Sequence, residues 1–176
     1  MYIVTIHQTI IHIMLRVLNI SEGTSVDGPG LRTSIYFAGC SHQCEGCHNP
    51  QSWDSQGGRE MSEEELLSVV DYNDFPVTFS GGDPLFQLEA VTNLAKRLKQ
   101  EQGRNIWCYT GYRWEQIAGK PEYAELLQHI DVLVDSPFVL ALRDISLRFR
   151  GSSNQRIIDV KASLEKGEMV DVTERY

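Results

Sequence analysis

The chain lacks a run of basic residues, a long apolar segment and an internal repeat. Its 176 residues carry 16 Lys and Arg against 24 Asp and Glu, a formal net charge of −8. This balance argues against a nucleic-acid backbone as partner, because that would call for a basic surface. The one local group of basic residues comprises Arg143, Arg148, Arg150 and Arg156. The 41% apolar and 23% charged content is typical of a soluble globular protein.

The first fifteen residues contain no Lys, Arg, Asp or Glu. They are too few to span a membrane, and they lack the basic start and small-residue cleavage site of a signal peptide. A cleaner strand pattern begins at Met14. We therefore expect residues 1–13 to be a dispensable extension and residues 14–176 to form a single domain. With no targeting segment, the default location is the cytoplasm, where thiols stay reduced.

Apolar strands alternate with amphipathic helices, which predicts an α/β fold with a mainly parallel sheet. The expected strands cover residues 16–20, 31–38, 76–80, 105–109, 130–134 and 156–160, the first of them at an edge. The expected helices cover residues 61–72, 87–102, 114–118, 121–129 and 138–142. Ser62 and Glu65 have the spacing of a capping box. The polar tail from Lys161 is expected to fray.

Three of the four cysteines fall within eight residues, in a C-x3-C-x2-C pattern. They are Cys40, Cys44 and Cys47. Three thiolates on one loop can hold three irons of a four-iron cubane and leave the fourth iron open, which usually signals chemistry. A zinc site completed by His42, His48 or Cys108 is the alternative, although zinc ligands normally come as two separated groups. A disulfide framework is less favoured still, because three cysteines this close cannot all pair.

The fourth cysteine, Cys108, lies inside an apolar predicted strand, where a lone cysteine is usually a small core residue. The unusual segments instead follow predicted strands. They are the cysteine loop, Gly81-Gly82-Asp83-Pro84, Thr110-Gly111-Tyr112 and Asp135-Ser136. Ligand sites in such folds lie at the carboxyl ends of the strands, so this agreement predicts one active site. Glycines let backbone approach a ligand, and a carboxylate can hold an ammonium group, although a plain turn remains the alternative.

Together these residues resemble the radical S-adenosylmethionine enzymes, whose signature is C-x3-C-x2-C after the first barrel strand. Asp27-Gly28-Pro29-Gly30 and Cys47-His48-Asn49 are similar to the subgroup that activates glycyl radical enzymes. Gly81-Gly82-Asp83-Pro84 resembles the methionine-binding motif of that family. Three later blocks resemble the activases of anaerobic ribonucleoside-triphosphate reductase: Trp107 with Tyr109-Thr110-Gly111-Tyr112, then residues 131–135, then residues 150–155. The resemblance covers roughly residues 15–160.

The resemblance implies an oxidoreductase with one [4Fe-4S] cluster, ligated by Cys40, Cys44 and Cys47. S-adenosylmethionine would chelate the open iron, with its amino end held by Gly81, Gly82 and Asp83. Its other side would be lined by Gly46, Cys47 and His48. An electron from reduced flavodoxin or ferredoxin would cleave the cofactor to methionine and a 5′-deoxyadenosyl radical. That radical would abstract a hydrogen from a glycine of the reductase. No nucleic-acid or membrane partner is implied.

Two positions depart from the wider superfamily and match the subgroup: Gly46, where an aromatic residue is frequent, and Asp83, where Glu is frequent. The chain is short for a full barrel, so an incomplete TIM-like β/α barrel is expected. Tyr112, Ser136 and Asn154 are candidates for adenine and ribose contacts. The rival interpretations are a pyruvate formate-lyase activase, against which residues 150–155 argue, and a small radical enzyme acting on a metabolite. A zinc or electron-carrier module using all four cysteines is the non-enzymatic alternative.

Overall fold

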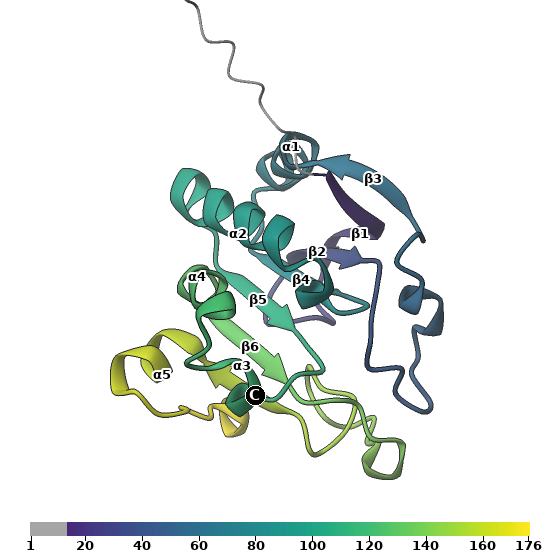
Figure 1. The fold of residues 1–176 in the computed structure, drawn as a ribbon, viewed down its shortest axis with the longest axis vertical. Coiled ribbons are helices and arrows are strands. Elements are labelled where there is room, and N and C mark those ends of the chain that lie inside the picture. Colours follow the sequence, from purple (N-terminus) through teal and green to yellow (C-terminus); the bar gives the residue numbers. More distant parts are fainter. Residues whose placement is uncertain (1–13) are drawn as a thin grey trace, which may run out of the picture.

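A computed structural model describes residues 14–176, so the predicted extension at residues 1–13 lies outside the described residues. A seven-stranded open sheet runs through the molecule in the order β3-β1-β2-β4-β5-β6-β7 (Figure 1). The strands are β1 (Met14–Thr24), β2 (Arg32–Phe37), β3 (Arg59–Ser62), β4 (Val77–Gly81), β5 (Ile106–Tyr109), β6 (Val132–Asp135) and β7 (Arg156–Asp159). The four central strands β2, β4, β5 and β6 are parallel, whereas β1, β3 and β7 pair antiparallel with their neighbours.

The parallel centre agrees with the prediction, whereas one edge differs from it. The first strand was expected at an edge, but β1 lies between β2 and β3. The sequence gives little sign of β3, because residues 59–62 are mostly polar and exposed. They form a strand by pairing with residues 14–17 of β1, more than forty positions away. Long-range pairing of this kind overrides local strand propensity.

The helices are α1 (Glu63–Asn73), α2 (Leu88–Gln102), α3 (Trp114–Ile117), α4 (Pro121–His129) and α5 (Val160–Lys166). Short 3-10 turns cover Pro50–Trp53, Pro84–Gln87, Leu140–Leu142 and Thr173–Arg175. The capping box of α1 is confirmed: Ser62 Oγ accepts from Glu65 N at 3.2 Å, and Glu65 Oε2 accepts from Ser62 N at 2.7 Å. Helices α1, α2 and α4 lie on one side of the sheet (Figure 1).

The tail from Lys161 does not fray, so that prediction is wrong. Helix α5 covers Val160–Lys166, with the Asp159 side chain accepting from Ala162 N at 2.9 Å. Beyond it, Asp171 forms a bridge with Ile158, and Val172 is buried. The tail is polar in composition but pairs with β7, an interaction that composition does not reveal.

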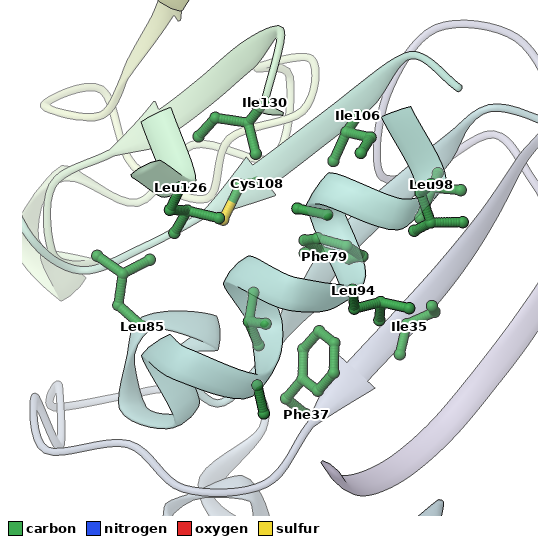
Figure 2. Packing of buried hydrophobic residues seen from close by; sticks show 14 of the residues in the cluster. Ile35, Phe37, Phe79, Leu85, Leu94, Leu98, Ile106, Cys108, Leu126 and Ile130 are labelled. Carbon is green, nitrogen blue, oxygen red and sulfur yellow. The ribbon is translucent and has the colours of Figure 1, made fainter. Parts of the chain in front are cut away.

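The face of the sheet beneath the helices, here called the helix-side face, is apolar. Figure 2 shows Phe37, Phe79, Leu94 and Cys108 in this cluster, all with no exposed surface. Burial raises the pKa of the Cys108 thiol well above its ordinary value. The prediction that Cys108 is a core residue is confirmed.

The opposite face, here called the loop-side face, comes from the alternate residues of the same strands. It carries polar and aromatic residues and a smaller apolar cluster that includes Val134 and Ile157, and Arg32 is buried within it. The Arg32 guanidinium donates from Nε to Thr78 Oγ1 at 2.7 Å and from Nη2 to Val77 O at 2.6 Å, and it lies 5.5 Å from the Trp107 ring centre. Burial lowers its pKa to about 10, which leaves it charged at neutral pH.

Candidate active site

A cavity of about 340 Å³ opens at the carboxyl ends of the parallel strands. Segments that follow β2, β4, β5 and β6 all contribute to its wall. The lining residues include Cys40, Cys44, Cys47, His48, Ser80, Gly81, Gly82, Tyr109, Thr110, Gly111, Ser136 and Phe138. The expected convergence of the strand-end segments is therefore found. Asp27, from the loop before β2, also lines the cavity, and its carboxylate accepts a short hydrogen bond from the Tyr36 hydroxyl.

The backbone around the first cysteine of the loop favours its thiolate. The backbone N–H groups of His42 and Gln43 lower the pKa of the Cys40 thiol. Gln43 has φ 46°, a left-handed conformation that turns successive N–H groups toward one point. Burial raises the pKa of the Cys40 thiol, and these N–H groups partly oppose that rise by stabilising the thiolate.

The other two cysteines are held in a similar way. The Cys47 sulfur accepts from Asn49 N at 3.4 Å. The Cys44 sulfur accepts a backbone hydrogen bond from Phe138, which belongs to the segment after β6. Burial raises the pKa of the Cys44 thiol despite this bond. Hydrogen bonds from backbone N–H groups to sulfur are typical of iron–sulfur ligation.

The donor set fits a [4Fe-4S] cluster held on three sides. The three loop cysteines are free and partly exposed and line the cavity, and backbone N–H groups act on all three sulfurs, lowering the pKa of Cys40 and Cys44 and donating to Cys47 at 3.4 Å. Within residues 14–176, no three His, Cys, Asp or Glu side chains are grouped closely enough to hold a metal ion. The fit therefore rests on the type of donor atom, their number and their hydrogen bonds.

Gly81 and Gly82 line the cavity, and a tight backbone crossing also explains why they are glycines. A Cβ on Gly82 would lie 2.3 Å from Gly39 O, and one on Gly81 would lie 2.4 Å from Phe37 N. Gly82 N donates to Phe37 O at 2.8 Å, and Asp83 N donates to Gly39 O at 2.8 Å. Close approach was predicted for a ligand, and the structure shows it between the ends of β4 and β2.

Asp83 is buried, with 2% of its surface exposed. Its carboxylate accepts from Thr110 Oγ1 at 2.9 Å, from Gly111 N at 3.1 Å and from Leu85 N at 2.9 Å. His42 Nε2 lies 2.8 Å from Asp83 Oδ2. Asp83 is not among the described residues that line the cavity. Its carboxylate therefore joins three segments of the protein to one another.

The remaining predicted residues divide into those that line the cavity and those that lie beside it. His48 and Ser136 belong to the lining. Gly46, Tyr112 and Asn154 are not among the described lining residues. The Tyr112 ring packs against His42 at 4.6 Å, and Asn154 Nδ2 donates to Pro137 O at 2.8 Å.

Sequence reasoning missed the apolar part of the wall, which includes Trp53, Phe138, Leu147 and Phe149. The Tyr109 hydroxyl donates to Phe149 O at 3.0 Å and fixes that segment over the loop-side face. Phe138 follows the Asp135-Ser136-Pro137 segment directly, so its position after a strand was the available signal. Leu147 and Phe149 lie in a long loop with no local pattern that could have identified them.

Comparisons with known proteins show which family the chain is similar to. Residues 26–158 match the family of 4Fe-4S single cluster domains. Proteins named anaerobic ribonucleoside-triphosphate reductase-activating protein are similar over most of their length. The one from Vibrio cholerae is 39% identical over 141 residues, covering 75% of this chain and 90% of that protein. Those from Salmonella typhi and Haemophilus influenzae are 37% and 35% identical over 139 and 143 residues, covering 74% and 75% of this chain and 89% and 90% of their own. Within residues 14–176, no helix has the length and apolar character to cross a membrane.

Proposed function

Because the chain belongs to the family of anaerobic ribonucleoside-triphosphate reductase-activating proteins, we propose that it is the enzyme that installs a glycyl radical on that reductase. The observation that carries the proposal is the strand-end cavity, which is lined both by three free thiols of one loop and by the Gly81-Gly82 segment. The reductase is the protein substrate, and reduced flavodoxin or ferredoxin is the electron donor. The cytoplasm is the proposed location.

Cys40, Cys44 and Cys47 would each bind one iron of a single [4Fe-4S] cluster, leaving the fourth iron for S-adenosylmethionine. With both bound, one electron from the cluster would cleave the cofactor to methionine and a 5′-deoxyadenosyl radical, which takes a hydrogen atom from a glycine of the reductase. Backbone N–H groups around the sulfurs would moderate the negative charge of the loaded loop.

The residues around the cysteines would orient S-adenosylmethionine. We assign its amino end to the Gly81-Gly82-Asp83 segment and its other side to Gly46, Cys47 and His48. Four of these six residues line the same cavity as the thiols, which supports the assignment: Cys47, His48, Gly81 and Gly82. Phe138 and Phe149 form an apolar part of the wall. Their role would be to keep water away from a reactive radical.

The open sheet is consistent with an incomplete TIM-like β/α barrel. Its four parallel strands end at the cavity, and within residues 14–176 the sheet does not close on itself, with β3 and β7 as its outermost strands. A closed barrel admits small molecules at its mouth, whereas an open one leaves room for a loop of another protein. We propose that the glycine-bearing loop of the reductase enters at this open side.

Electron paramagnetic resonance of the anaerobically reconstituted, reduced protein tests the function directly. Adding S-adenosylmethionine should change the cluster spectrum, and 5′-deoxyadenosine should accumulate. Mixing with anaerobic ribonucleoside-triphosphate reductase should then give a glycyl radical signal. A spectrum indifferent to S-adenosylmethionine, or bound zinc in place of iron, would contradict the proposal. A glycyl radical on pyruvate formate-lyase and none on the reductase would favour the other activase.

A further inference from the structure

We propose that His42 is a positioning residue that fastens the cysteine loop to the ends of β4 and β5 through Asp83. His42 lies between the first two cysteines, and no contact with a reacting atom is assigned to it. The attachment itself is a property of the protein chain alone. Its importance for the cluster rests on the proposed function.

His42 is attached to the strand ends through its side chain. It follows Cys40 by two residues in the cysteine loop, and its Nε2 lies 2.8 Å from Asp83 Oδ2. The side chains are 18% and 2% exposed, so little water competes for this hydrogen bond. One residue therefore connects the cysteine loop to a buried carboxylate.

The other end of the connection is firmly built. The Asp83 carboxylate accepts from Leu85 N after β4, and from Thr110 Oγ1 and Gly111 N after β5. With His42, four donors converge on two oxygens, which is close to the capacity of a carboxylate. Asp83 is therefore an anchor for three segments, and its contribution to cofactor binding runs through their placement.

Packing supports the same conclusion independently of the hydrogen bond. The His42 ring meets the Tyr112 ring edge-on, with 4.6 Å between ring centres. Gly111 also lies against this ring, where a Cβ would come within 2.4 Å of His42 Cδ2. In the segment after β5, the missing side chain of Gly111 therefore leaves space for the imidazole, and the Tyr112 ring packs against it.

Hydrogen–deuterium exchange of the full-length apoprotein measures the attachment without any cluster. His42→Ala should speed exchange about tenfold in peptides covering residues 39–47 and 109–113, because a hydrogen bond to a charged group is lost. His42→Gln retains an amide that can donate to Asp83 and should stay near the wild type. Ser41→Ala, in the same loop and exposed, is the matched control and should leave exchange unchanged.

The reconstituted variants give a second readout. His42→Ala should still bind iron but should weaken the change that S-adenosylmethionine makes in the resonance spectrum, and it should raise the KM for S-adenosylmethionine. His42→Gln should restore both. A general loss of stability would instead lower iron content and spare the spectrum of the remaining cluster.

Unchanged exchange in His42→Ala, or equal exchange in His42→Gln and His42→Leu, would overturn the proposal. The Gln and Leu variants have similar bulk and differ in the hydrogen bond, so they decide the question even if His42→Ala does not fold. If the wild-type protein forms no 5′-deoxyadenosine, the proposed function is refuted. The exchange result for the attachment of His42 to Asp83 remains valid in that case. The two failures are therefore distinguishable.

Discussion

Alternate residues of the same strands face two different environments in this molecule. On the helix-side face, Phe37, Phe79 and Cys108 are fully buried among other apolar side chains. On the loop-side face, Arg32 is also buried, but hydrogen bonds hold it in place. Trp107 is buried there too, in a smaller apolar cluster with Val134 and Ile157. The apolar face holds the strands in register, and the other face can then carry polar groups beneath the cavity. Stability and chemistry thus use opposite sides of one sheet.

The cysteines provide the largest expected contrast between these regions. Cys40→Ser should abolish the cluster, because three thiols are needed to hold three irons. Cys108→Ser should retain the cluster and lose only stability, because Cys108 is a buried core residue on the helix-side face. Iron and sulfide analysis with visible absorbance after anaerobic reconstitution measures both. Loss of iron in Cys108→Ser would favour the four-cysteine module.

Truncation of a core ring tests the helix-side face. Phe79→Ala should cost about 3–5 kcal/mol of unfolding free energy, since Phe79 is fully buried and packs edge-on against Phe37 at 5.5 Å. Urea denaturation followed by circular dichroism gives the value. Phe79→Leu, which keeps most of the volume, is the control and should lose much less.

Removing the buried cation tests the loop-side face. Arg32→Met should cost about 1–3 kcal/mol, because Val77 O and the Asn105 side chain lose a donor while the space stays filled. The same denaturation measures it. A loss as large as that of Phe79→Ala would show that both faces contribute equally to stability and would break the contrast.

The smallest effect is expected at the start of α1, at the edge of the helix-side face. Ser62→Ala removes the side chain that accepts from Glu65 N and should cost about 1 kcal/mol. Denaturation should show a lower midpoint with an unchanged slope. Ser62→Asp preserves an acceptor at the N-cap and should stay close to the wild type.

The elements of the fold that could be predicted from the sequence depend on residues close together in the chain. The capping box needs only Ser62 and Glu65, and the parallel strands show their apolar runs locally. Strand β3 and the ordered tail could not be predicted, because each is stabilised by a distant strand. The cysteine loop was identified from its spacing alone. The contact between His42 and Asp83 joins positions 41 residues apart, so no local sequence pattern predicts it.

The backbone crossing at Gly81 and Gly82 has a consequence for mutational surveys of this site. Any side chain at Gly82 would collide with the carbonyl oxygen of Gly39 before a cofactor arrived. Loss of activity in Gly82→Ala would therefore be explained by displacement of the strand end. It would give no information about which cofactor the cavity binds. Cofactor contacts are better mapped at His48, which lines the cavity and is exposed.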